Sequence, residues 1–140
     1  MPIRLLPILR DIAIVFVATL VAGLLVALTL GQSSRGTPLW NISMTLAVAV
    51  FSIGAFFASA HLATTNRFAH VYIVAALSAI PTSIYYAIRT APTLATFAGP
   101  IVLMLVYASA GAGLSYVVRR SGPAAAGPRS NTSLERTREG

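Results

Sequence analysis

The 140-residue chain contains no cysteine and no lysine, and it has only three acidic residues. Without cysteine it can form no disulfide, no thiolate metal site and no cysteine nucleophile. The acids are Asp11, just before the first apolar stretch, and Glu135 and Glu139 near the end of the chain. No nucleophile–base–acid set can be assembled from them, so we do not expect an enzyme.

Charged residues of either sign are scarce. They make up 9% of the chain, whereas a soluble domain carries about 25%. Hydrophobic residues make up 56%, and four long apolar stretches contain no Asp, Glu, Lys or Arg. Each stretch can cross a hydrocarbon core of ~30 Å as a helix. The sequence therefore predicts an all-α integral membrane protein, a four-helix up-and-down bundle with spans at about 12–30, 39–62, 71–88 and 94–118.

Local signals predict where the helices begin. Asp11 precedes the first apolar stretch, and a carboxylate there would interact with the free N–H groups of a starting helix. Thr37 and Pro38 fit the cap and the first residue of the second helix. Either Pro92 or Pro100 is expected to open the fourth helix, because proline is favoured in the first turn.

The composition changes abruptly after residue 118. The last part of the chain is rich in Arg, Ser, Gly, Pro and Ala, a composition that cannot bury enough apolar surface to fold. We therefore expect a transmembrane domain over residues 1–118 and a disordered cytoplasmic tail over residues 119–140.

All ten basic residues are arginines, and most flank the apolar stretches. With both termini in the cytoplasm, five of those next to the spans lie inside and two outside, as the positive-inside rule requires; the five are Arg4, Arg10, Arg67, Arg119 and Arg120, and the two are Arg35 and Arg89. The exclusive use of arginine indicates a GC-rich bacterial genome, so we expect a bacterial inner membrane. No basic stripe with interleaved aromatics exists on a soluble domain, so membrane lipid rather than nucleic acid is the expected partner.

Small side chains recur every four residues within the apolar stretches. Because lipid removes the hydrophobic drive between helices, such residues allow the close backbone approach that holds membrane helices together. The candidate packing residues are Thr19, Gly23, Gly54, Ala58, Ala75, Ala79, Ser109 and Gly113. The fourth stretch is the richest, and there Gly111 shares a face with Ser115. These faces either pack within the chain or bind another subunit.

Each stretch also carries one polar side chain near its middle: Thr19, Ser52, Ser78 and Tyr107. Facing one interior, they would form a small neutral pocket. Alternatively, they bond to nearby backbone carbonyls or to one another. Pro81 lies mid-span in the third stretch, where it bends the helix and frees the carbonyl of Leu77. This kink either opens the pocket or is purely structural.

His61 and His70 bracket the second loop and are the only imidazoles. They would form either a two-histidine metal or haem site or a pair in contact with lipid headgroups. Two ligands without a neighbouring carboxylate make a weak site, so we expect no metal and no cofactor.

In size and helix number the chain resembles the small multidrug exporters. It lacks a carboxylate within its predicted spans, however, so proton-driven export is not expected.

Two functions remain compatible with these features. The first is a non-enzymatic accessory or assembly subunit, or a homo-oligomer, that acts through helix packing. The alternative is a small channel or facilitator for a neutral solute, which would use the mid-depth hydroxyls and the bend at Pro81.

Overall fold

The computed structural model describes residues 5–63, 66–89 and 93–121. They form four long helices and one short 3₁₀ turn, with no strand in these ranges; the elements are α1 (Leu5–Leu30), η1 (Gln32–Ser34), α2 (Pro38–Leu62), α3 (Arg67–Arg89) and α4 (Leu94–Ser121). All four helices are long and apolar enough to span a membrane. The all-α prediction is confirmed, and the fold is that of a membrane protein.

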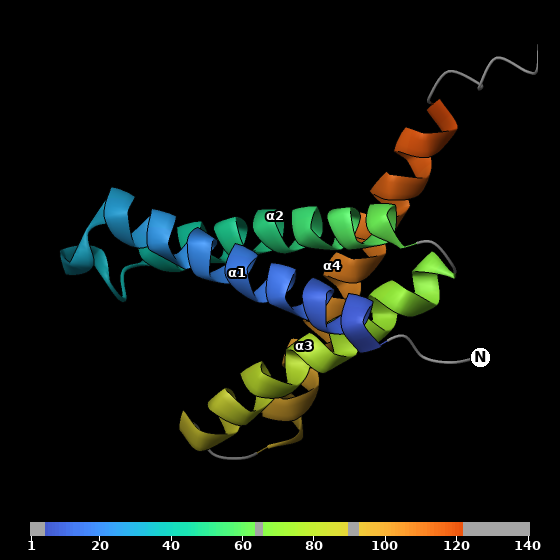
Figure 1. The fold of residues 1–140 in the computed structure, drawn as a ribbon. Helices are drawn as coiled ribbons and strands as arrows, with labels where there is room; N and C mark the ends of the chain where they lie inside the picture. The colour runs from blue at the N-terminus through green and yellow to red at the C-terminus, as the bar shows by residue number, and fades with distance from the viewer. Residues whose placement is uncertain (1–4, 64–65, 90–92, 122–140) are drawn as a thin grey trace, which may run out of the picture.

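The helices form two antiparallel pairs (Figure 1). α1 lies beside α2, and α3 lies beside α4. The pairs are close together at the end where α1 and α3 begin, and they diverge toward the other end. Contacts between α2 and α4 join the pairs, whereas α1 and α3 contact each other less extensively. The last turns of α4 extend beyond the end of α2 (Figure 1).

The first helix begins earlier than the sequence predicts. α1 starts at Leu5, six residues before Asp11, so the prediction that Asp11 lies at the helix start is wrong. Pro7 is tolerated because it lies in the first turn, where its missing N–H would have no helical acceptor. Asp11 therefore lies about 9 Å along the helix axis from the first residue. A charged side chain at this depth needs partners supplied by other helices.

The other helix ends agree only in part with the predictions. Thr37 caps α2 as predicted: its side chain accepts a hydrogen bond from the Trp40 N–H, and Pro38 is the first helical residue. Pro100 does not open α4, since it lies inside that helix. The hydroxyl of Ser83 on α3 donates to the carbonyl of Phe97 at 3.1 Å, which joins the two helices in the turn before Pro100.

The boundary predicted at residue 118 also shifts. α4 continues through Arg119 and Arg120 to Ser121, so the first residues of the predicted tail are helical. Two arginines in the last turn of a helix are favourable, because they lie at the negative end of its dipole. The predicted disorder of residues 122–140, like the prediction that Pro92 opens α4, lies outside the described residues.

At Gly111, α4 lies directly against the backbone of α2. A Cβ atom added there would lie 2.7 Å from both the Ile53 carbonyl oxygen and the Phe57 nitrogen. Such distances leave room for a hydrogen atom only. Glycine at this position therefore allows the two pairs of helices to pack against each other.

Candidate functional site

The most unusual feature of the fold is a buried carboxylate that accepts hydrogen bonds from three side chains. Arg10 Nε–H donates to Asp11 Oδ1 at 2.7 Å, and Ser59 Oγ–H donates to Oδ2 at 2.6 Å. His70 Nε2 lies 2.8 Å from the same Oδ2. Asp11 itself has no exposed surface. We name Asp11, Ser59 and His70, with Arg10, the Asp11 cluster.

Three helices supply the Asp11 cluster. Asp11 comes from α1, Ser59 from the last turn of α2 and His70 from the first turn of α3. Arg10 and Ser59 donate to Asp11, and an ionised carboxylate, which has acceptors only, suits such surroundings. His70 then donates to it through Nε2–H. Burying an unpartnered carboxylate would be very costly, so these bonds are a condition for the fold.

The structure corrects the predictions for the two histidines. The expected lack of a neighbouring carboxylate is wrong for His70, which pairs with Asp11. His61 is exposed and stacks on Phe57, with 6.0 Å between the ring centroids. The two imidazoles therefore have different partners, and no two-histidine site is formed. Among residues 5–63, 66–89 and 93–121, no group of three His, Cys, Asp or Glu side chains could hold a metal ion.

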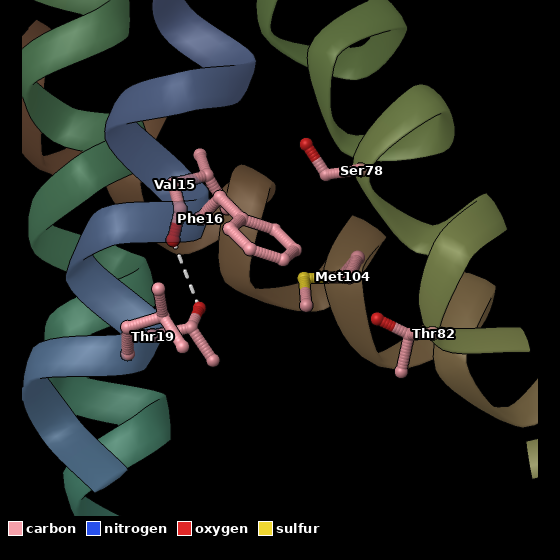
Figure 2. A pocket seen from close by; sticks show the side chains of 7 residues that line it. Val15, Phe16, Thr19, Ser78, Thr82 and Met104 are labelled. Carbon is pink, nitrogen blue, oxygen red and sulfur yellow. Dashed lines mark hydrogen bonds between the residues drawn. The ribbon is translucent and has the colours of Figure 1, made fainter. Parts of the chain in front are cut away.

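A small cavity of about 90 Å³ lies between α1, α3 and α4. Figure 2 shows its lining residues, with the side chains of Ser78 and Thr82 on α3 opposite Phe16 and Thr19 on α1. The complete lining is Val15, Phe16, Thr19, Leu20, Ser78, Thr82 and Met104. Thr19 donates its hydroxyl to the carbonyl of Val15 at 2.9 Å, whereas Ser78 Oγ has no partner in the described part of the chain. The cavity is therefore largely apolar, with a few hydroxyls.

The cavity and the Asp11 cluster lie along the same helix faces. On α1, Val15 and Thr19 follow Asp11 at intervals of four residues and therefore share its face. On α3, Val74 and Ser78 follow His70 at the same interval. Val15 and Val74 are buried in one apolar cluster. Val15 and Val74 thus lie between the Asp11 cluster and the hydroxyls of the cavity, and Val15 also lines the cavity.

The mid-depth polar residues predicted to share one pocket do not all meet. Thr19 and Ser78 line the cavity, but Ser52 and Tyr107 do not. Ser52 is fully buried and its Oγ has no partner among the described residues, whereas Tyr107 lies in the core. Pro81 is exposed within α3, one residue before Thr82. The cavity therefore contains two of the four residues predicted to form a pocket, Thr19 and Ser78, together with Thr82.

The predicted packing residues divide into an inward and an outward set. Ala75 and Ala79 are fully buried, and a Cβ on Gly23 would lie 3.3 Å from Met44 Cε of α2. By contrast, Gly54 is exposed, and Ala58 and Gly113 are partly exposed. Ser109 is also exposed, but its Oγ lies 3.0 Å from the hydroxyl of Tyr72 on α3 and so joins α4 to α3. Nothing lies within 4 Å of a Cβ placed on Gly54 or Gly113.

Two functional positions were missed in the sequence, and each left a signal. Leu5, Leu6, Ile8 and Leu9 extend the apolar pattern before Arg10, which would have moved the helix start and placed Asp11 inside α1. Gly111 was noted in the richest stretch, but Gly113 was chosen as the packing residue. Only the orientation of α4 distinguishes these two glycines.

Comparisons with models of protein families, with curated proteins and with solved structures found no match for this chain. Its function therefore has to be argued from its own residues.

Proposed function

We propose that this chain is a non-enzymatic membrane protein that acts through helix packing and forms a homo-oligomer, with the Gly54–Ala58 face of α2 as its contact surface. The observation that carries the proposal is the open space over Gly54, which is exposed on a face that also presents the exposed side chains of Leu46 and Val50. An exposed glycine in a helix is less favourable than alanine by about 1 kcal/mol. No contact within the described chain compensates for it, whereas a second helix packed on this face would.

The face around Gly54 has the character of a helix–helix interface. Leu46 and Val50 precede Gly54 at intervals of four residues and are 61% and 65% exposed, and Ala58 follows one turn later. Small residues such as Gly54 and Ala58 form a notch that lets the backbone of a second helix approach closely in lipid. The large side chains beside the notch then pack against that helix. The notch is separate from the contact with α4, which uses Ile53 and Phe57.

A second copy of the chain is the occupant that fits this face. The face carries no charge and contains one notch, so two copies related by a two-fold axis present the same groove to each other. An axis along the membrane normal keeps both copies in the same orientation. We propose that both termini lie in the cytoplasm of a bacterial cell; the excess of arginines at the end where α1 and α3 begin supports this orientation.

Replacing Gly54 by leucine is expected to weaken self-association about tenfold, since a side chain in the notch costs one to three kcal/mol of overpacking. Energy transfer between labelled copies in liposomes, measured as lipid dilutes the protein, gives the dissociation constant. Val102→Leu, an exposed position on α4, is the matched control and should leave it unchanged. A wild-type chain that remains monomeric at every lipid ratio, or equal association of the Gly54 variant, would refute the proposal.

The cavity favours a second candidate function, a facilitator for a small neutral solute. Its volume of about 90 Å³ is several times the roughly 10–15 Å³ that one water molecule needs, so it can hold a small solute. The hydroxyls of Ser78 and Thr82 offer hydrogen bonds to such a solute, and the divergence of the helix pairs lies beyond them.

Solute flux distinguishes the two functions. If the cavity conducts, liposomes with the protein should show faster water, urea or glycerol entry than empty liposomes in stopped-flow light scattering. Thr82→Val should slow this entry about fivefold, because one hydrogen bond of about 1 kcal/mol is lost. Thr45→Val is the control, since Thr45 is exposed, lies outside the cavity and donates to the carbonyl of Asn41 on its own helix. Equal rates with and without protein would exclude the facilitator and leave the assembly function unaffected.

A further inference from the structure

A second, smaller pocket lies between α2, α3 and α4, where α2 ends and α3 begins. Its volume is about 30 Å³, and it is lined by Ala60, Arg67, Phe68, Ala112, Ser115 and Tyr116. This second pocket has room for only one or two atoms the size of a water oxygen. Its lining combines a cation, a buried hydroxyl and two aromatic rings, which together suit a ligand with an anionic and an apolar part.

Arginines flank the end of α2 at this pocket. Arg67 donates through Nε–H to the Ala63 carbonyl at 3.1 Å, and Arg119 donates through Nη2–H to the His61 carbonyl at 2.8 Å. These bonds satisfy carbonyls that the end of a helix leaves without partners. Each guanidinium has five N–H donors, so both bonds hold the cations in place and leave donors for an anion.

The start of α3 adds to this positive potential. Arg67 is the first residue of this 23-residue helix, and no acidic residue occupies its first turn. The first N–H groups of a helix point outward without helical acceptors and carry partial positive charge. Such a terminus is a ready site for a phosphate or carboxylate.

Ser115 provides the independent sign of a ligand. The residue is 2% exposed and lines the pocket, and its Oγ has no hydrogen-bond partner in the described part of the chain. Other serines on α4, such as Ser109 and Ser121, donate to the carbonyl one turn earlier. A buried hydroxyl without an acceptor costs free energy unless a ligand supplies one.

We propose that this pocket binds the phosphate of an anionic phospholipid. One phosphate oxygen enters the pocket and accepts from Ser115 Oγ–H, while Arg67 and the N-terminus of α3 neutralise its charge. A lipid rather than free phosphate is indicated by Phe68 and Tyr116, which are 49% and 57% exposed beside the pocket. Aromatic rings at this level lie against headgroups and the upper acyl chains. This site is independent of the Gly54 face.

Native mass spectrometry of the full chain tests the proposal. The protein, delipidated in a neutral detergent, is titrated with phosphatidylglycerol, with phosphatidylcholine or with inorganic phosphate. One phosphatidylglycerol should bind at least about tenfold more tightly than phosphatidylcholine, and millimolar phosphate should not displace it. Equal binding of the two lipids would overturn the anion site, and displacement by free phosphate would overturn its assignment to lipid.

Three variants locate the site. Arg67→Gln should weaken phosphatidylglycerol binding about tenfold and Ser115→Ala about threefold, whereas Arg67→Lys should retain most of it because the positive charge remains. Arg120→Gln is the matched control: the same charge is lost from an exposed position on α4 outside the pocket. Thermal unfolding of each variant without lipid identifies any that fail to fold. An equal loss in Arg67→Gln and Arg120→Gln, or an unchanged Ser115→Ala, would overturn the proposal.

Discussion

Replacing Asp11 by alanine is expected to lower the free energy of unfolding by about 3 kcal/mol. The substitution removes the common acceptor of Arg10, Ser59 and His70. Breaking a buried ion pair by removing one partner costs about 3–5 kcal/mol, because the remaining polar groups stay buried without partners. We take the lower limit, since the Arg10 side chain is 48% exposed and can turn to water. Unfolding in mixed detergent and sodium dodecyl sulfate, followed by circular dichroism, measures the change.

Controls separate the individual bonds of the Asp11 cluster. Asp11→Asn keeps the shape and one acceptor oxygen, so it should cost less than the alanine variant. Arg10→Gln should cost about 1 kcal/mol, less than the alanine variant, because the Arg10 side chain is half exposed and Asp11 keeps its bonds to Ser59 and His70. A double-mutant cycle between Asp11→Ala and Ser59→Ala should give a coupling of about 1.5–3 kcal/mol, the range for a hydrogen bond to a charged group. Additive losses would show that the bond between Ser59 and Asp11 does not contribute.

The second large effect is expected at Gly111. A methyl group there would meet the Ile53 carbonyl oxygen, the Phe57 nitrogen and Phe56 Cβ within 2.8 Å. Two of these atoms belong to the backbone of α2, so no side-chain rotation relieves the overlap and the two helices have to separate. We expect Gly111→Ala to lower the free energy of unfolding by about 3 kcal/mol, at the upper end of overpacking effects.

Gly113 provides the matched control on the same helix. A Cβ on Gly113 meets nothing within 4 Å, so Gly113→Ala should be neutral or stabilise the helix by up to about 1 kcal/mol. The two variants differ only in the face of α4 that carries the methyl group. Equal stability of the Gly111 and Gly113 variants, measured by the same unfolding assay, would contradict the close approach of α2 and α4.

The features that could be predicted from the sequence are local ones. The four long apolar stretches predicted four helices because lipid requires every backbone group to be bonded within its own segment. Thr37 and Pro38 predicted the start of α2, since a cap bonds to residues two or three positions away. The prediction for Asp11 was wrong although it rested on a local feature, because a carboxylate is also stable inside a helix when neighbouring helices supply its partners, here Ser59 and His70.

The candidate sites could not be predicted in this way, because their members are far apart in the chain. Asp11 and His70 are 59 residues apart, and neither suggests the other by spacing or residue type. Gly54, Gly111 and Gly113 are equivalent in sequence, each in an apolar stretch with small neighbours. Their roles depend on which face of the helix is covered.

The order of apolar and polar residues predicted four helices that are long and apolar enough to span a membrane, and the lack of cysteine excluded thiol chemistry. The tertiary structure decided which faces meet: it buried Asp11 among three helices, placed Gly111 against the backbone of α2 and left Gly54 uncovered. The physical reason is that transfer into lipid depends on the sum of side-chain polarities along a segment, which can be read from the sequence. Packing depends on the relative rotation of rigid helices, which only their contacts determine.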